Sequence, residues 1–360
     1  MKVLIVTSSL SGGGTERVSV ILANFLSRAG HNVSMVVLYL KGTTYHLDES
    51  IRLYKLPYLK ANRKKSNIIQ EMHSSIIDFF SLRKIIANNK IDVIISFCIL
   101  PAILMLLLRK RMTIITTKRN YPPASPPLKF FFEKQIFKRS DAVVFQTMEQ
   151  MLFYDKKICE KGIVIPNPLL ENLLAPYKGE RKKEVVTFCR LTKQKNLLML
   201  IDGFVRFYKK FPEYKMVIYG NRERHDSSYK DILKKHIIEE KMEHIIEIKN
   251  FSHDIHNIIK DSACFVLTSD FEGMSNSMLE AMAIGLPVIC TDCRGGGARA
   301  FIKNYENGIL IPINDREALS QALEYIATNP EKAQQMGRNA IGVREALSVE
   351  KICRQWMNII

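Results

Sequence analysis

The chain has 360 residues, which is long for one domain and sufficient for two, and 47% of them are hydrophobic, enough for two buried cores. Its net charge of +17 is unevenly distributed along the chain. Residues 1–168 hold 25 Lys and Arg against 11 Asp and Glu, whereas residues 169–360 hold 28 Lys and Arg against 25 Asp and Glu. The longest apolar run, Val93 to Leu108, contains Pro101 and is short for a membrane span, which argues against an integral membrane protein. The first residues resemble a buried strand rather than a signal peptide, so we expect a cytoplasmic protein.

The first half of the chain alternates strand patterns with helix patterns. Strands are predicted at Lys2–Thr7, Val33–Leu40, Val93–Phe97, Thr113–Thr116 and Ala142–Gln146, and helices at Glu16–Arg28, Ser75–Ala87 and Leu100–Lys110. A glycine turn over residues 12–14 joins the first strand to the first helix. This alternation predicts a parallel, doubly wound sheet in an α/β domain.

The second half repeats the alternation after a candidate boundary at Pro166-Asn167-Pro168. Strands are predicted at Val185–Phe188, Lys215–Tyr219, Ile245–Ile248, Cys264–Thr268, Val288–Thr291 and Gly308–Ile311, and helices at Asn196–Phe211, Tyr229–Glu239, Ile255–Lys260, Ala298–Asn304, Arg316–Thr328 and Glu331–Ala346. We therefore predict one domain over residues 1–166 and a second over residues 167–346. A C-terminal helix, at about residues 347–360, is expected to pack back on the first domain.

One stretch of the second half, residues 270–289, predicts a ligand site. It continues a strand through a loop into a short helix, for which Ser275, Asn276 and Ser277 are candidate N-caps. Glu272 lies in the loop and Glu280 about one turn inside the helix, so both carboxylates and the helix amides can face one crevice at the strand's carboxyl end. A helix N-terminus favours an anion and carboxylates suit hydroxyl groups, which fits a ligand that is part phosphate and part sugar.

Two cations follow the first strand of the same half. Arg190 and Lys195 lie at the carboxyl end, where they suit a diphosphate, although a solvated basic loop is the alternative reading. No Asp-x-Asp motif is present, so we expect no metal-clamped diphosphate. The glycines at 12–14 match neither G-x-G-x-x-G nor a P-loop, and either a phosphate cradle or a plain tight turn explains them.

A basic and aromatic segment marks the first half. Aromatic residues over Phe130–Phe137 mix with Lys129, Lys134, Lys138 and Arg139, a composition that suits an anionic membrane surface. The alternative is a half-buried helix with a solvated basic side. No nucleic-acid-binding motif accompanies the positive charge, so nucleic acid is not an expected partner.

Five motifs taken together resemble the retaining family 4 glycosyltransferases of the GT-B fold, in particular the bacterial members that build capsule, exopolysaccharide or lipid-linked oligosaccharides. They are Glu272-x7-Glu280, Arg190-x4-Lys195, Gly13-Gly14-Thr15-Glu16-Arg17, Pro166-Asn167-Pro168 and Gly285-Leu-Pro-Val-Ile. The resemblance covers nearly the whole chain. It implies two Rossmann-like doubly wound domains facing a central cleft, an N-terminal acceptor-binding domain and a C-terminal nucleotide-sugar-binding domain.

The resemblance also implies roles for individual residues. Arg190 and Lys195 would hold the donor diphosphate, and Glu280 the ribose hydroxyls. Glu272 would hold the transferred sugar. The remaining donor-side residues would be Gly13 and Gly14 of the first loop, Gly273, Met274, Ser275, Asn276 and Ser277 around the helix start, and Tyr219, Gly220, Asn250 and Phe251 near uridine.

The acceptor side departs from the family at one point. Many relatives have a His in the loop that here contains Lys118, Arg119 and Asn120. We assign Arg119 to the catalytic residues on this basis, and Thr15, Glu16 and Asn120 to the acceptor side.

The resulting expectation is a retaining, metal-independent hexosyltransferase that needs no cofactor. It would move a hexose or an N-acetylhexosamine from a UDP-sugar to a polyprenyl-diphosphate-linked saccharide in capsule or lipopolysaccharide biosynthesis, at the inner face of the cell membrane, as a monomer or weak dimer. Two alternatives stay open: a GT-B-type UDP-sugar epimerase, and a non-catalytic binder of anionic lipid or nucleic acid.

Overall fold

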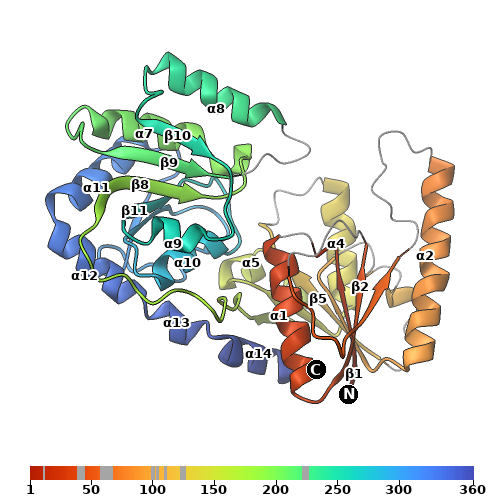
Figure 1. The fold of residues 1–360 in the computed structure, drawn as a ribbon. Helices are drawn as coiled ribbons and strands as arrows, with labels where there is room; N and C mark the ends of the chain where they lie inside the picture. Colours follow the sequence, from red (N-terminus) through yellow and green to blue (C-terminus); the bar gives the residue numbers. More distant parts are fainter. Residues whose placement is uncertain are drawn as a thin grey trace. The chain divides into compact units, whose positions relative to one another are not determined.

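The computed structural model describes residues 1–10, 13–38, 45–56, 68–98, 102, 105–108, 112–121, 127–220 and 227–360. These residues form two compact units (Figure 1). The first contains Met1–Pro168 together with Val349–Ile360, and the second contains Leu169–Ser348.

The first unit is built on a parallel sheet of seven strands in the order β3-β2-β1-β4-β5-β6-β7. Its strands are β1 (Lys2–Thr7), β2 (Asn32–Val37), β3 (Arg52–Lys55), β4 (Val93–Ser96), β5 (Thr113–Lys118), β6 (Ala142–Phe145) and β7 (Gly162–Val164). Its helices are α1 (Gly14–Arg28), α2 (Ile68–Asn89), α4 (Pro127–Arg139), α5 (Met148–Leu152), α6 (Lys156–Cys159) and α14 (Val349–Met357).

The second unit is built on a parallel sheet of six strands in the order β10-β9-β8-β11-β12-β13. Its strands are β8 (Lys182–Phe188), β9 (Lys215–Tyr219), β10 (Ile246–Lys249), β11 (Ser262–Leu267), β12 (Val288–Thr291) and β13 (Ile309–Ile311). Its helices are η2 (Lys193–Lys195), α7 (Leu197–Tyr208), α8 (Ser227–Glu239), α9 (Ile255–Ile259), α10 (Asn276–Ala283), α11 (Arg316–Thr328), α12 (Pro330–Ala340) and α13 (Val343–Ala346).

Both sheets share one topology. In each, the chain starts at a central strand, winds outward over two neighbours, and then crosses back to build the other side. The reversal falls between β1 and β4 in the first unit and between β8 and β11 in the second. These are the topological switch points at which doubly wound sheets bind ligands. The prediction of an α/β fold with two Rossmann-like sheets is therefore confirmed.

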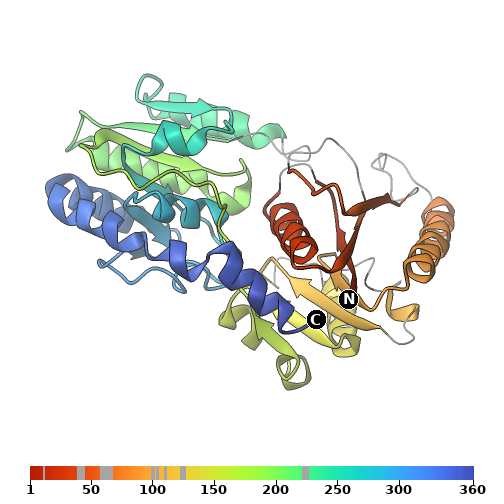
Figure 2. The same cartoon turned by 60° about the horizontal axis from the view of Figure 1, so that its bottom comes forward.

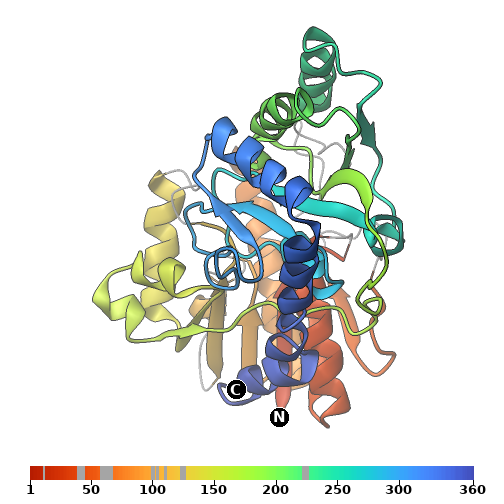
Figure 3. The same cartoon turned by 90° about the vertical axis from the view of Figure 1, so that its left-hand side faces the viewer.

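Helices α7, α8 and α11 cover one face of the second sheet. Their apolar side chains, including Leu200, Phe204 and Leu319, form one buried cluster with strand residues such as Val266 and Ile289. Figure 3 views the second unit from the side that α11 and α12 cover. The cluster gives the carboxyl ends of β8 and β11 a rigid support.

The last helix, α14, belongs to the first unit, where it packs against α1. Its single tryptophan, Trp356, is fully buried. The N and C termini lie near each other in Figures 1, 2 and 3.

Some predicted elements differ from the structure. The predicted helix Ala298–Asn304 is wrong, because Gly295 and Gly296 take positive φ angles and the segment forms only turns before the bridge from Asn304 to Gly308. The predicted helix Glu331–Ala346 breaks into α12 and α13 around Gly342. The predicted helix Leu100–Lys110 lies partly outside the described residues.

Candidate active site

Two loops meet at the switch point of the second sheet. The loop after β8 carries Arg190 and Lys195, and the loop after β11 carries Glu272. The Thr268 hydroxyl joins the loops, donating to the carbonyl oxygens of Lys195 and Asn196 at 3.0 Å each. The structure thus brings the predicted cation tract and the predicted carboxylate loop together.

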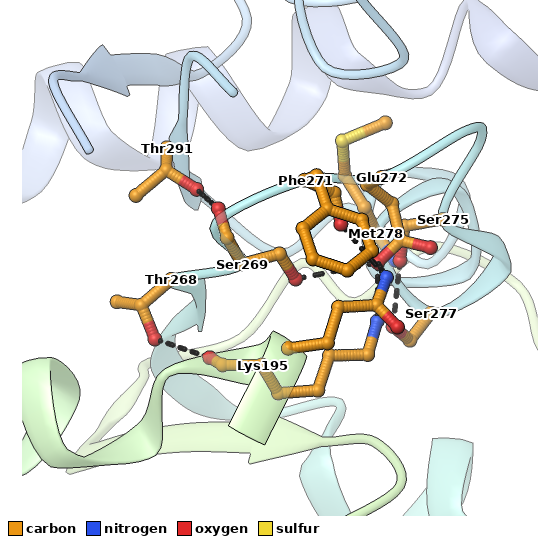
Figure 4. A network of polar contacts seen from close by, with 10 residues as sticks. Lys195, Thr268, Ser269, Phe271, Glu272, Ser275, Ser277, Met278 and Thr291 are labelled. Carbon is orange, nitrogen blue, oxygen red and sulfur yellow. Dashed lines mark hydrogen bonds and ion pairs between the residues drawn. The ribbon is translucent and has the colours of Figure 1, made fainter. Parts of the chain in front are cut away.

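Lys195 and Glu272 form an ion pair at the centre of these loops (Figure 4). Lys195 Nζ lies 2.5 Å from Glu272 Oε2, and the two side chains are only 7% and 17% exposed. Ser269 Oγ donates to the same carboxylate oxygen at 3.3 Å, and Gln194 Nε2 donates to the Phe271 carbonyl at 2.7 Å. The sequence analysis did not single out Ser269 or Gln194, although Gln194 lies between Arg190 and Lys195 and Ser269 directly precedes the predicted stretch 270–289.

The charge of Lys195 is maintained by its partner. Desolvation by burial acts to lower the pKa of Lys195, but the Glu272 carboxylate and Cys189 together act in the opposite direction, and the pKa is raised above its usual 10.5. The positive charge of Arg190, which is exposed, opposes this rise. Arg190 thus lies within electrostatic range of Lys195.

The start of α10 lies directly after Glu272. Ser275 caps the helix by accepting from the Met278 amide at 3.4 Å, and its hydroxyl lies 3.0 Å from that of Ser277. Gly273 is buried against the glycine loop after β12, where a Cβ on Gly297 would lie 1.9 Å from the Gly273 carbonyl oxygen. The backbone around Gly273 and Met274 is thereby held in one position before α10, which begins at Asn276.

Glu280 has a partner that no sequence pattern indicated. His256 Nε2 of α9 lies 2.7 Å from Glu280 Oε2, and the two side chains are 16% and 7% exposed. The residues are 24 positions apart, so no helical spacing relates them.

The residues predicted to lie near uridine follow β9 and β10. Tyr219 pairs with Phe188 and with Lys249 in the parallel register, which brings the ends of the three strands to one edge. Gly220 packs closely against the backbone of Cys189: a Cβ added to Gly220 would lie 2.3 Å from the Cys189 carbonyl oxygen. Asn250 and Phe251 come next after Lys249, and both are exposed.

In the first unit, the predicted residues gather at the switch point between β1 and β4. The Glu16 carboxylate accepts from the hydroxyls of Ser8 at 2.8 Å and Ser9 at 3.1 Å, which follow β1. It folds over Gly13, where a Cβ would lie 1.8 Å from Glu16 Oε2. Gly14 and Thr15 begin α1 beside it. Gly12 of the predicted glycine turn lies outside the described residues.

Arg119 is enclosed by aromatic rings. Its guanidinium lies 4.9 Å from the Phe97 ring centre and 5.7 Å from that of Trp356, and Nη1 donates to Asn167 Oδ1 at 2.9 Å. Burial lowers the pKa of Arg119 to about 9. Within the described residues, its Nε and Nη2 atoms are buried without a hydrogen-bond partner. The neighbouring Asn120 is exposed. Arg119 thus joins Phe97, directly after β4, to the C-terminal helix and the Asn167 segment.

Helix α4 carries the aromatic and basic segment that the sequence singled out, but only part of it is exposed, because Phe137 is fully buried and Phe130 packs against the same core. Leu128, Phe131 and Phe132 are 70%, 53% and 48% exposed. The opposite side is anchored by Glu133, which is fully buried and accepts hydrogen bonds from Lys118 at 2.7 and 2.8 Å and from the Tyr154 hydroxyl. The helix therefore has a feature of each interpretation of the sequence. One side is buried, as in a half-buried helix, and the other exposes apolar residues beside lysines, as a membrane-facing segment would.

Membrane spans and metal sites can be judged for the part of the chain that the structure describes. No described helix is long and apolar enough to cross a membrane. One group of three potential metal ligands occurs, formed by Asp202, His236 and Glu240. The Asp202 carboxylate already contacts His236 Nε2 at 2.5 Å and Arg316 Nε at 2.7 Å.

Family models and relatives match nearly the whole chain. A model described as Glycosyl transferases group 1 matches residues 175–343, and one described as Glycosyltransferase Family 4 matches residues 12–169. An uncharacterized glycosyltransferase of Haemophilus influenzae is 25% identical over 97% of each chain. A GalNAc-alpha-(1->4)-GalNAc-alpha-(1->3)-diNAcBac-PP-undecaprenol alpha-1,4-N-acetyl-D-galactosaminyltransferase of Campylobacter jejuni is 23% identical over 100% of this chain and 98% of its own. A UDP-Gal:alpha-D-GlcNAc-diphosphoundecaprenol alpha-1,3-galactosyltransferase of Escherichia coli is 26% identical over 86% and 84%.

Solved structures share the fold at low identity. HepE of Anabaena, in complex with UDP and glucose, superposes with a TM-score of 0.82 at 16% identity, covering 100% of this chain and 99% of that one. TarM superposes with a TM-score of 0.82 at 17% identity, covering 99% and 98%. At such identities the likeness concerns the fold alone.

Proposed function

Because this chain is a glycosyltransferase of the family 4 type with the GT-B fold, we propose that it transfers a hexose or an N-acetylhexosamine from a UDP-sugar to a lipid-linked saccharide. The family predicted from the five sequence motifs is thus confirmed. The donor, the acceptor and the stereochemistry are the proposed part.

The observation that carries the proposal is the buried Lys195–Glu272 ion pair at the switch point of the second sheet, with the exposed Arg190 on the same loop as Lys195. Two neighbouring cations suit the two phosphates of a nucleoside diphosphate. The adjoining carboxylate accepts from sugar hydroxyls, and the amides at the start of α10 add positive potential beside it. A donor that joins a diphosphate to a sugar uses all three features.

In the proposed reaction, the acceptor hydroxyl attacks the anomeric carbon on the face from which the diphosphate departs. The bond from the anomeric carbon to the phosphate oxygen breaks, the bond to the acceptor oxygen forms, and the departing oxygen takes the hydroxyl proton. This course retains the anomeric configuration. Arg190 and Lys195 stabilise the negative charge that develops on the diphosphate, so the proposal requires no metal ion or cofactor.

Glu272 is an unsuitable nucleophile for a double-displacement alternative. Its carboxylate is held by Lys195 at 2.5 Å and by Ser269 at 3.3 Å, which lowers its readiness to form a covalent bond. We therefore propose that it orients the sugar, as the family resemblance implies.

The proposed acceptor is a polyprenyl-diphosphate-linked saccharide at an anionic membrane surface. The named Campylobacter and Escherichia relatives act on undecaprenol-linked saccharides. On this chain, the exposed Phe131 and Phe132 of α4 are flanked by Lys129 and Lys134, so apolar rings can enter a lipid interface while the cations remain at the headgroups. We propose that the protein works on the inner face of the cell membrane, bound peripherally through this face, and contributes to a surface polysaccharide.

An assay of UDP release tests the proposal against its rivals. A transferase releases UDP from a UDP-sugar only when a lipid-linked acceptor is present, and the labelled sugar appears in the lipid fraction. An epimerase would change the donor sugar without any acceptor, and a non-catalytic binder would change nothing. Nuclear magnetic resonance of the product reports the anomeric configuration, and an inverted linkage would refute the front-face mechanism.

A further inference from the structure

A histidine outside every sequence motif holds one of the predicted donor-binding carboxylates. His256 Nε2 lies 2.7 Å from Glu280 Oε2, and both side chains are largely buried. An ionised carboxylate only accepts hydrogen bonds, so the imidazole is the donor. The contact links α9 to α10, which no local sequence pattern requires.

Aromatic packing fixes the histidine ring from a second side. The Phe188 ring meets it edge to face, with centroids 6.0 Å apart and an interplanar angle of 89°. Phe188 ends β8 and packs in turn against Phe265 of β11 at 5.2 Å. These two strands flank the switch point, so the ring of His256 is supported by the sheet itself.

We infer that His256 is a positioning residue that orients the Glu280 carboxylate toward the ribose hydroxyls of the donor nucleotide. The inference rests on the proposed function, which gives Glu280 its ligand. A carboxylate turns readily about its last side-chain torsion unless a donor fixes it. Fixing it before the nucleotide arrives removes an ordering cost from binding. His256 therefore sets both the affinity for the nucleotide and the preference for a ribose over a deoxyribose.

Calorimetric titration of the full chain tests this role with UDP and 2′-deoxy-UDP as probes. We expect His256→Leu to weaken UDP binding about tenfold, the size of one hydrogen bond to a charged group. In the same variant, the affinity for UDP divided by the affinity for 2′-deoxy-UDP should fall toward one. His256→Gln, whose amide can still donate to Glu280, should stay within about threefold of wild type. The exposed His244, changed to Leu, is the matched control.

Kinetics and a double-mutant cycle separate positioning from mere packing. In His256→Leu the KM for the donor should rise while kcat stays within about twofold, because the change affects ground-state and transition-state binding alike. Added to Glu280→Gln, it should weaken UDP binding no further, since His256 acts through Glu280.

Two results would overturn this inference and leave the proposed function intact. The first is a His256→Leu protein with wild-type affinity for UDP and a wild-type ratio of UDP affinity to 2′-deoxy-UDP affinity. The second is full additivity of the losses in UDP binding caused by His256→Leu and Glu280→Gln. If thermal melting shows that the leucine variant does not fold, His256→Ala takes its place in every comparison. A wild-type protein that binds no UDP would refute the proposed function, and this inference with it.

Discussion

Replacing Lys195 with methionine removes one charge from the centre of the site while keeping most of the side-chain volume. Breaking a buried ion pair costs about 3–5 kcal/mol when the remaining charge is fully buried. Here Glu272 is 17% exposed and keeps its hydrogen bond from Ser269, so we expect a loss of about 2 kcal/mol in the free energy of unfolding. For a unit of this size, that lowers the Tm by about 4–8 °C.

The same substitution should damage catalysis far more than folding. Loss of a preorganised cation at the leaving group costs about 100-fold or more in kcat/KM. Lys193→Met, at an exposed lysine two positions earlier, is the matched control and should leave both Tm and activity near wild type. Differential scanning fluorimetry measures the first quantity, and UDP release in the presence of acceptor measures the second.

The pH dependence of the stability difference follows from the direction of the Lys195 pKa shift. Because its folded-state pKa is raised above 10.5, the stabilisation is complete at neutral pH and is lost only as the pH rises through the raised value. The Tm difference between wild type and Lys195→Met should therefore be constant between about pH 6 and about pH 9. A Lys195→Met protein with wild-type Tm and with kcat/KM within about threefold of wild type would refute the reasoning.

Three further substitutions give separate checks. Arg119→Ala should lower the free energy of unfolding by about 2–4 kcal/mol in a denaturant titration, because two aromatic contacts and a hydrogen bond are lost, and Arg119→Lys should not restore it. Gly297→Ala places a Cβ 1.9 Å from the Gly273 carbonyl oxygen, so it should lower Tm by several degrees and weaken UDP binding. The control is Gly342→Ala, whose Cβ would lie 3.6 Å from its nearest neighbour and which should change neither quantity. Equal effects of the two substitutions would contradict the steric argument. Phe131→Ser with Phe132→Ser should reduce flotation with anionic liposomes at low salt without lowering Tm, and wild-type protein that stays in the soluble fraction would remove the membrane proposal.

The sequence predicted most of the fold because its strands are buried apolar runs bounded by turn residues. Lys2–Thr7, Lys215–Tyr219 and Val288–Thr291 have the predicted bounds, and so does the helix Arg316–Thr328, which Asp315 caps. Two strands escaped prediction. β3 is mostly exposed and β7 only half-buried, so neither carries the apolar pattern by which the others are recognised.

The candidate site was predictable to the level of loops but not of side-chain contacts. Lys195 and Glu272 both follow strands that reach one edge, which the alternation of elements already implies. That they bind each other, and that His256 binds Glu280, depends on rotamers and on the position of α9, which spacing does not encode. The catalytic role given to Arg119 stays a prediction, and its aromatic enclosure is a tertiary feature that involves the distant Trp356.

Binding of UDP to the wild-type protein tests the central claim most directly. The protein is titrated calorimetrically with UDP, GDP, ADP and CMP, each in the presence of magnesium and again in the presence of EDTA. The proposed function predicts saturable binding of UDP with the same affinity in both conditions, and weaker or no binding of the other nucleotides. Binding of no nucleotide, or binding of UDP that disappears with EDTA, would contradict a metal-independent diphosphate site built on Arg190 and Lys195.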